Sequence, residues 1–444
     1  MHFDDALSYL LSLGHETLTI KLGLDNTERL LAALGNPQDD FPAIQIAGTN
    51  GKGSTAVMLE SICRAAGVRT GLFTSPHLVS ITERIRLDGE QVSEEDFAHF
   101  TTEVKKAAEE LIEAGYLDTR PTFFEHITAI ALLAFRAAKV NLAILETGLG
   151  GRLDSTTAAD AQVVAITQIS MDHQEYLGQS LAEIAAEKAA ITKPGVVAIV
   201  APQPTEALEV IVRRCERVGV QPRLIDPDTV QIDETSADGR VRISLETVHD
   251  SYKQVWLGLR GRHQIENAAT AIALAEALRD QGFSISRQAI VEGVAHATHP
   301  GRLEIWEGPP RILFDGAHNP AAARALRDYL EEFVKVPITM VFGGMRDKAL
   351  GEMASILFTR AHRLVLTEFD NPRAATLDLL SSALPQGLEQ MEVGYASSAA
   401  AALNMAKKMT STNGLICVTG SLYLIGAIME VAGKDLLESM SAKS

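Results

Sequence analysis

The sequence predicts an α/β protein in which parallel sheets are covered by helices on both faces. Three observations indicate this class: short apolar runs alternate with helical stretches, a glycine-rich loop follows the first run, and a second alternating series begins after a turn-rich link. Such alternation is typical of parallel sheets, because each crossover between parallel strands needs a long connection, usually a helix. With 444 residues, the chain exceeds the usual size of one hydrophobic core, so two or three domains are expected.

The first alternating series extends from about residue 41 to residue 195. Its expected strands are bounded by glycine- or serine-containing turns and cover residues 43–47, 71–74, 142–146, 163–169 and 196–200. Residues 221–260 differ, because apolar and polar residues alternate there around the turn Ala237-Asp238-Gly239, which predicts an antiparallel hairpin. Helical spacing returns at residues 265–278.

A domain boundary is expected in the turn-rich stretch Thr298–Gly301, so we assign residues 1–298 to the first domain and residues 299–444 to the second. No GxGxxG pattern opens the second part, which argues against a nicotinamide-type dinucleotide domain. Its expected elements are strand 311–314, helix 321–333, strand 338–342, strand 363–368, helix 397–409 and strand 415–419.

Composition excludes several classes of protein. A content of 46% hydrophobic and 22% charged residues is ordinary for a soluble globular chain. The net charge of -17 argues against a general nucleic-acid binder or a protein that adheres to anionic membranes, because both need a basic face. Cys63, Cys215 and Cys417 form no CxxC pair, and the N-terminus has no signal-peptide pattern, so a reducing, cytoplasmic setting is expected.

The stretch Ile46–Thr55, IAGTNGKGST, places three glycines and a lysine directly after an apolar strand. Backbone amides in such a loop can surround an anion. The spacing departs from the Walker form, because Gly48 lies only three residues before Gly51 and a further glycine separates Lys52 from Ser54. The pattern leaves two interpretations, a nucleotide-phosphate site and a simple tight turn.

Polar residues follow several of the expected strands. Glu146 ends strand 142–146 beside a glycine loop, which is how a Walker-type carboxylate reaches Mg²⁺. Ser75 follows the second strand, and Asp172 and His173 follow the fourth. Each of these is an ordinary loop or strand-end residue when taken alone. Because ligands of open parallel sheets bind at the carboxyl ends of the strands, the group together favours a binding site.

Lys188 interrupts the apolar face of an expected helix. The capping box SLAE begins this helix near residue 181, and Lys-Pro-Gly ends it after about residue 192. By helical spacing Lys188 lies on the same face as Ala185 and Ile191. Two interpretations are open. In the first, the stem of Lys188 passes the core and its ammonium reaches solvent or an ion pair. In the second, the buried amine loses its proton and reacts with CO₂ to give a metal-binding carbamate.

Further segments are compatible with ligand contacts. Asp315 and His318, in ILFDGAHNP, lie between a strand and a helix with proline in its first turn, which suits a nucleotide-binding loop. Asn267 begins an alanine-rich helix. Arg302 lies just past the expected domain boundary, where its side chain either reaches a phosphate or only caps the turn between the domains. The aromatic pair in Thr122–Ala129, TFFEHITA, lines an organic-substrate pocket or attaches a helix to the core.

In order along the chain, these segments resemble the folylpolyglutamate synthase and dihydrofolate synthase family of the Mur ligase superfamily. The resemblance spans almost the whole sequence and rests on AGTNGKGS, FTSPHL, TFFEH, LETGLGGRLD, MDH, AAEKAAI, RGRHQIENA, FDGAHNP and VTGSLYLIG. It implies a P-loop-type parallel-sheet ATPase domain followed by a smaller Rossmann-like domain that closes over it. It also implies an ATP-dependent amide ligase: a folate-type carboxylate becomes an acyl phosphate, which the amine of L-glutamate then attacks.

The resemblance also implies roles for individual residues, of which Lys52, His173 and Lys188 would act in catalysis. Residues expected to bind the phosphates are Gly48, Thr49, Asn50, Gly51, Lys52, Gly53 and Ser54. Residues expected to hold two Mg²⁺ ions are Ser75, Glu146, His173 and a carbamylated Lys188. Residues expected to contact ATP from the lid side are Asn267, Arg302, Asp315 and His318. Residues expected to contact the pterin are Thr122, Phe123, Phe124, Glu125, Leu153, Asp154 and Ser155.

Three functional interpretations follow from the sequence. The favoured one is a bifunctional enzyme that adds glutamate to dihydropteroate and extends the glutamate tail of tetrahydrofolate. The second is an enzyme that only extends the tail, and the third is a nucleotide-binding switch without ligase activity. We expect a monomer with small-molecule substrates and neither nucleic-acid nor membrane partners.

Overall fold

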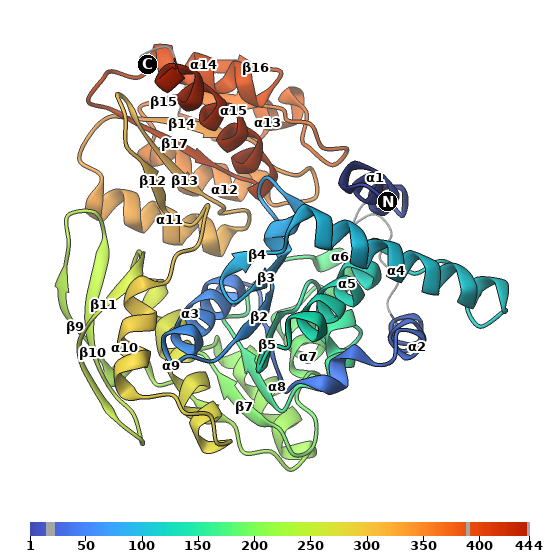
Figure 1. Cartoon of the computed structure of the whole chain (residues 1–444). Helices are drawn as coiled ribbons and strands as arrows, with labels where there is room; N and C mark the ends of the chain where they lie inside the picture. The colour runs from blue at the N-terminus through green and yellow to red at the C-terminus, as the bar shows by residue number, and fades with distance from the viewer. Residues whose placement is uncertain (15–22, 388–390, 442–444) are drawn as a thin grey trace.

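The computed structural model describes residues 1–14, 23–387 and 391–441, which form three β-sheets with helices packed around them (Figure 1). The first sheet has eight strands in the order β4-β3-β2-β5-β1-β6-β7-β8. Their bounds are β1 Ala43–Ala47, β2 Thr70–Phe73, β3 Ile85–Leu87, β4 Glu90–Gln91, β5 Leu142–Glu146, β6 Val163–Ile166, β7 Val197–Val200 and β8 Arg223–Leu224. From β2 to β8 all neighbours are parallel, as the sequence predicts.

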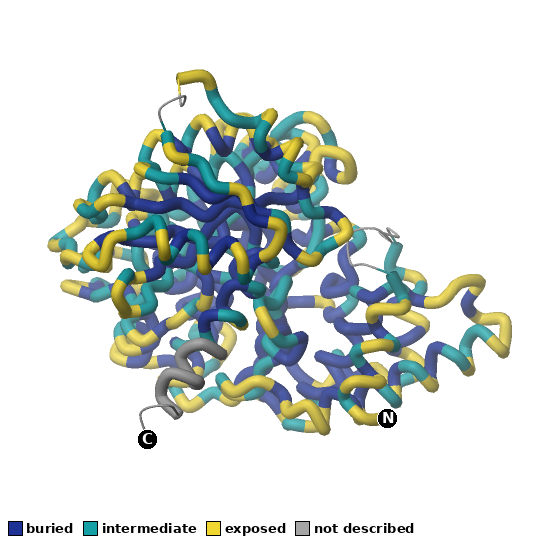
Figure 2. Tube along the Cα trace, turned by 90° about the horizontal axis from the view of Figure 1, so that it is seen from above, coloured by how far each residue is buried: buried dark blue, intermediate teal, exposed yellow. Residues whose placement is uncertain are grey.

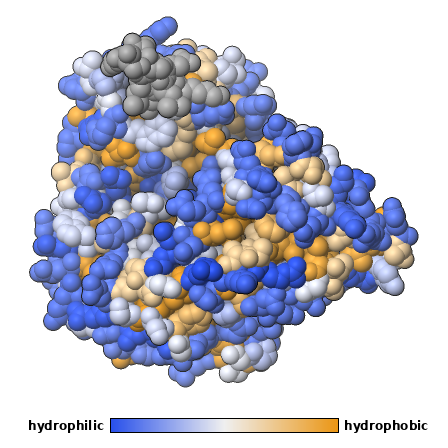
Figure 3. All heavy atoms as spheres, viewed as in Figure 1, coloured by the Kyte–Doolittle hydropathy of each residue, from blue (hydrophilic) through white to orange (hydrophobic). Residues whose placement is uncertain are grey.

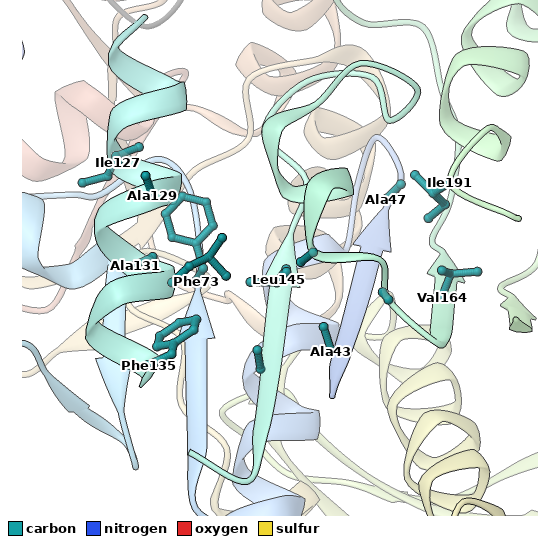
Figure 4. Packing of buried hydrophobic residues seen from close by; sticks show 14 of the residues in the cluster. Ala43, Ala47, Phe73, Ile127, Ala129, Ala131, Phe135, Leu145, Val164 and Ile191 are labelled. Carbon is teal, nitrogen blue, oxygen red and sulfur yellow. The ribbon is translucent and has the colours of Figure 1, made fainter. Parts of the chain in front are cut away.

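One face of this sheet is covered by helices from the N-terminal third and by α7 and α8. The inward side chains of the strands pack against α5, as Figure 4 shows for Phe73 and Phe135, which lie between that helix and the sheet. The helices on this side are α1 Phe3–Ser12, α2 Asp25–Ala33, α4 Glu94–Glu113, α5 Phe123–Ala138, α7 Leu181–Ala189 and α8 Thr205–Arg217.

The opposite face is covered by three helices and, beyond them, by a second sheet. The helices are α3 Lys52–Ala65, α9 Gln264–Asp280 and α10 Arg287–His296. The second sheet is antiparallel, with strands β9 Val230–Thr235, β10 Arg240–Glu246 and β11 Ser251–Arg260. The sequence predicts a hairpin here, and the structure extends it to three strands. In β10 buried residues alternate with more exposed ones, because one face of the sheet packs on the core and the other meets solvent.

The third sheet is formed by the C-terminal part of the chain, in the order β12-β13-β17-β14-β15-β16. Only β12 runs antiparallel. Its strands are β12 Glu304–Trp306, β13 Arg311–Asp315, β14 Ile338–Phe342, β15 Arg363–Thr367, β16 Glu392–Ala396 and β17 Leu415–Thr419. Helices α11 Pro320–Phe333, α12 Leu350–Leu357 and α13 Leu377–Ser382 cover one face, and α14 Ala399–Met409 and α15 Leu422–Ser441 cover the other.

Two predicted elements extend about three residues beyond the observed ones. β6 ends at Ile166 rather than at residue 169, because the Gln168 carbonyl turns to accept hydrogen bonds from the amides of Thr49 and Asn50. The helix α7 ends at Ala189 rather than near residue 192, since the Thr192 amide already bonds to the Ala189 carbonyl in a tighter turn. The strands β3, β4, β8 and β12 were not predicted, because two or three residues carry little periodic signal. β16 was also missed, because of its five residues only Ala396 is buried and the segment does not form an apolar run.

Buried residues concentrate in the strands, and exposed residues lie on the outer helices and loops (Figure 2). The face seen in Figure 3 is mostly hydrophilic, with smaller hydrophobic areas between. Among the helices of the described ranges, none has the length and apolar character needed to cross a membrane. The predicted boundary after residue 298 falls between α10, which packs on α3, and β12 of the third sheet, and it stays a prediction.

Candidate active site

A glycine-rich loop joins β1 to α3 and is held closely by its neighbours. The amides of Thr49 and Asn50 donate to the Gln168 carbonyl at 3.0 and 3.1 Å. Gly51, the residue before α3, has a φ of +88°, and a Cβ placed there would lie 2.2 Å from Oδ1 of Asn267. Both facts require glycine at this position. The first turn of α3 contains no acidic residue, so its free amides and helix dipole favour an anion.

Lys52 is folded back into this loop. Its ammonium donates to the carbonyls of Gly48 at 3.1 Å and Thr49 at 3.3 Å. Burial lowers the pKa of Lys52, while the carboxylates of Glu146 and Asp172 act in the opposite direction. The lysine therefore lies where it can contact a phosphate held by the loop.

The predicted metal-binding groups meet at the carboxyl ends of the strands. The Ser75 amide donates to Oε2 of Glu146 at 3.2 Å, and Glu146 is buried at the end of β5. Burial raises the pKa of Glu146, and the nearby Lys52 opposes that shift. His173 precedes α6 (Gln174–Leu177) and, with Ser75 and Glu146, lines a cavity of about 630 Å³ that the glycine-rich loop also borders.

These donors suit Mg²⁺ bound together with a nucleotide. Within the described part of the chain, no three His, Cys, Asp or Glu side chains are grouped closely enough to hold a metal by themselves. Mg²⁺ typically takes one or two carboxylates, with phosphate oxygens and water completing its shell. One carboxylate, a hydroxyl and an imidazole beside a phosphate loop fit that mode of binding.

Lys188 lies on the buried face of α7, as its helical spacing predicts, and its side chain also lines the cavity. Burial, followed by the positive charge of Lys52, lowers the pKa of Lys188 to about 7. A substantial fraction of this amine is therefore uncharged near neutral pH, which is the form that reacts with CO₂.

The C-terminal part of the chain forms the opposite wall of the cavity. Asp315 ends β13 and accepts hydrogen bonds from the amides of Leu303 and Ala317, both at 3.1 Å. His318 bonds through Nδ1 to the Gly316 carbonyl at 2.8 Å. Arg302, together with Asn267 of α9, lines the same cavity. The structure thus brings together every residue predicted to contact phosphate, metal or ATP.

The predicted pterin-binding residues do not line this cavity. Thr122 and Glu125 form the capping box of α5, and Phe123 is buried with the Arg84 guanidinium 5.3 Å from its ring centre. Phe124 packs on Phe73 at 5.8 Å between ring centres. The sequence left two interpretations of this segment open, a substrate pocket and the attachment of a helix to the core. These contacts attach α5 to the core.

The second pterin-binding stretch is also occupied by local contacts. Asp154 caps the 3₁₀ helix Ser155–Ala159 and accepts from the Leu149 amide at 2.9 Å, while Ser155 accepts from the Thr27 hydroxyl at 3.2 Å. Leu153 lies in the turn before this cap. Gly148 and Leu149 do line the cavity, and a Cβ on Gly148 would meet the Phe124 ring at 2.4 Å. Phe124 and Asp154 are therefore next to the cavity wall, and their substrate role stays a prediction.

Several site residues were missed by the sequence reasoning because they act across the two parts of the chain. Nδ1 of His299 lies 3.2 Å from Oγ of Ser54, and the side-chain Nδ2 of Asn319 donates to Oδ1 of Asn50 at 2.9 Å. Lys348 forms a buried ion pair with Asp172. Asp172 was noticed beside His173 but given no role. For Lys348 a signal existed: a glycine pair and then charged residues follow the strand 338–342, the same strand-end pattern used in the first sheet.

The fold and the site define a ligase of the Mur type. Residues 46–275 match the Mur ligase middle domain, and residues 301–422 match the Mur ligase glutamate ligase domain. The dihydrofolate synthase/folylpolyglutamate synthase of Bacillus subtilis is 34% identical over 96% of this chain and 98% of its own. The chain belongs to the dihydrofolate synthase/folylpolyglutamate synthase family.

Solved structures agree with this assignment. Folylpolyglutamate synthase of Mycobacterium tuberculosis complexed with ADP superposes with a TM-score of 0.90, at 30% identity, over 97% of this chain and 98% of that one. A bifunctional folylpolyglutamate synthase/dihydrofolate synthase with Mn, AMPPNP and L-glutamate bound has a TM-score of 0.82 at 30% identity, with 98% of each chain covered. The predicted fold class and ligase family are confirmed.

Proposed function

We propose that this chain is an ATP- and Mg²⁺-dependent ligase that joins L-glutamate to dihydropteroate and to the glutamate tail of tetrahydrofolate. The observation that carries the proposal is the cavity between the two parts of the chain. It combines a phosphate loop, a strand-end carboxylate and a buried lysine. The family and the ligands of its solved members support the same activity.

The reaction has two steps. A carboxylate oxygen of the pteroate or folate attacks the γ-phosphorus of ATP, the bond to the β-phosphate oxygen breaks, and an acyl phosphate and ADP form. The α-amine of L-glutamate then attacks the acyl carbon, and orthophosphate leaves as the amide bond forms. Attack by an anion on a highly charged phosphoryl group needs charge neutralisation, which the loop amides and Lys52 supply.

The remaining residues divide between metal and nucleotide. Ser75, Glu146 and His173 would hold Mg²⁺, which would supply positive charge to neutralise the phosphates. Lys188, as a carbamate, would supply an anionic ligand for a second metal ion. The nucleotide is held from the opposite wall by Asn267, Arg302, Asp315 and His318.

The pteridine lies along the wall formed by Gly148 and Leu149, in reach of Phe124 and Asp154. Their position next to the cavity supports this placement. We further propose that the enzyme acts as a cytoplasmic monomer, in keeping with three widely separated, buried cysteines and one cavity formed within a single chain.

The test measures ADP formation by the purified protein with Mg-ATP and L-glutamate, with dihydropteroate or tetrahydrofolate as the acceptor, and identifies products by mass. Product from both acceptors supports the bifunctional enzyme. Product from tetrahydrofolate alone identifies an enzyme that only extends the tail and withdraws the dihydropteroate assignment. ADP formation that is independent of both acceptors would contradict the ligase itself.

A further inference from the structure

Lys348 lies in the loop after β14, and neighbouring segments fix the shape of that loop. The Arg346 amide donates to the Arg373 carbonyl at 2.9 Å, and the Arg373 guanidinium pairs with Asp347 at 2.6 Å. The Lys348 side chain is only 9% exposed. Its direction is therefore set by packing, and it points away from the third sheet toward the first.

The ammonium of Lys348 forms an ion pair with Oδ1 of Asp172, whose side chain is also buried. The same oxygen accepts a hydrogen bond from the His173 amide at 2.8 Å. The other oxygen, Oδ2, lies 3.4 Å from Nδ2 of Asn319 and 3.6 Å from Nε2 of His318. Asp172 is thus the point at which three side chains of the C-terminal part converge on the loop after β6.

This loop carries a backbone that needs support. His173 has a φ of +49°, a left-handed conformation that residues with a side chain seldom adopt and that surrounding contacts must maintain. The helix that follows, α6, has only four residues. The hydrogen bond from the His173 amide to Asp172 supports this conformation, so an ion pair that fixes the Asp172 carboxylate also fixes His173.

We propose that Lys348 is a positioning residue supplied by the C-terminal part: by pairing with Asp172 it holds His173 where the imidazole lines the cavity. The metal position is then complete only when both parts of the chain are together. The metal half of this inference rests on the proposed function, whereas the effect on the loop does not.

Three variants test the proposal. Lys348→Met removes the charge and keeps the length of the stem. Lys348→Arg keeps the charge. Lys335→Met is the matched control, because Lys335 is an exposed lysine of the same part, two residues beyond α11, whose ammonium donates to the Glu331 carbonyl at 2.8 Å. The first readout is amide hydrogen exchange of residues 168–177 without ligand. The second is Mn²⁺ binding in the presence of ADP, followed by electron paramagnetic resonance.

Lys348→Met should speed exchange in residues 168–177 and weaken Mn²⁺ binding by about tenfold, the size typical for loss of a residue that orients a metal ligand. Lys348→Arg should lie between Lys348→Met and the wild type in both exchange rate and Mn²⁺ affinity, and Lys335→Met should match the wild type. Wild-type exchange and Mn²⁺ affinity in Lys348→Met would overturn the proposal. So would a raised KM for L-glutamate with unchanged exchange, because Lys348 would then contact the substrate directly.

Asp172→Asn provides a second route if Lys348→Met does not fold. It retains Lys348 but removes the charge that the lysine pairs with, and it should produce the same two changes; unaltered exchange in this variant would equally overturn the proposal. A wild-type protein that fails to bind Mn²⁺ with ADP would contradict the proposed function instead, and the exchange measurement would still decide on Lys348.

Discussion

Lys188 shows how a single residue can be recognised before the structure is known. An ammonium in the apolar stripe of a helix is costly to bury, so the sequence already marked it as exceptional, and the structure places it against the cavity. Phe123 and Glu125 show the opposite outcome. An aromatic beside a carboxylate at a helix start fits both a pocket and a capped, packed helix, and only the three-dimensional contacts distinguish the two.

We predict that Lys188→Ala abolishes nearly all ligation while the fold is retained, because the truncated side chain cannot form a carbamate. Lys193→Ala is the matched control: Lys193 lies four residues beyond α7 and pairs with the exposed Asp160 at 2.9 Å, a contact worth little. Carbon-13 NMR with labelled bicarbonate should show a carbamate signal in the wild type and in Lys193→Ala only. Normal turnover of Lys188→Ala, or an identical spectrum, would contradict the carbamate.

At the scale of elements, the strands of both parallel sheets were predicted well because buried parallel strands are continuous apolar runs between turns. Polar residues at their carboxyl ends then had to meet at one edge, which located Ser75, Glu146 and His173. The short strands β3, β4 and β8, at or next to the edges of the first sheet, were not predicted because each has at most three residues. The glycine-rich loop was noticed in the sequence despite its irregular spacing, because three glycines and a lysine directly follow a strand. In the structure a Cβ on Gly48, Gly51 or Gly53 would lie within 3 Å of a neighbouring side chain.

Gly51 permits a test of this loop. In Gly51→Ala the new Cβ meets Asn267 Oδ1, and the left-handed backbone itself costs about 1 to 2 kcal/mol. Gly67→Ala, beyond the other end of α3, has a φ of +75° and no atom within 4 Å of the new Cβ, so it carries the backbone cost alone. By calorimetry, Gly51→Ala should bind ADP at least about tenfold more weakly, a loss of about 1.4 kcal/mol, and Gly67→Ala should bind normally. Equal losses in both variants would assign the effect to general destabilisation.

At the scale of the whole molecule, the contacts between the two parts were the least predictable. His299 with Ser54, Asn319 with Asn50 and Lys348 with Asp172 join residues that lie 176 to 269 positions apart in the chain. Such pairs leave no periodic trace in one sequence, because periodicity reports the face of a single element. The cavity belongs to the assembled molecule, although the two walls were each predicted from strand ends.

The stability of the whole molecule should depend on pH through its buried histidines. Burial lowers the pKa of His126 to about 4, from an ordinary value of 6.5. Between these values the unfolded chain binds a proton that the folded chain does not, so the free energy of unfolding falls as the pH falls through this window. The full loss, reached below pH 4, is about 3 kcal/mol for this one group.

His126→Asn removes this proton-binding difference, so between pH 7 and pH 4.5 its free energy of unfolding, from urea titrations, should fall by about 2 to 3 kcal/mol less than that of the wild type. Tyr9→Phe is the matched control, because it deletes the hydroxyl 3.0 Å from Nε2 of His126 but keeps the titrating ring. It should lower stability at every pH and retain the wild-type slope. Parallel curves for His126→Asn and the wild type would show that His126 binds its proton with the same pKa in the folded and unfolded protein, so that burial does not depress this pKa.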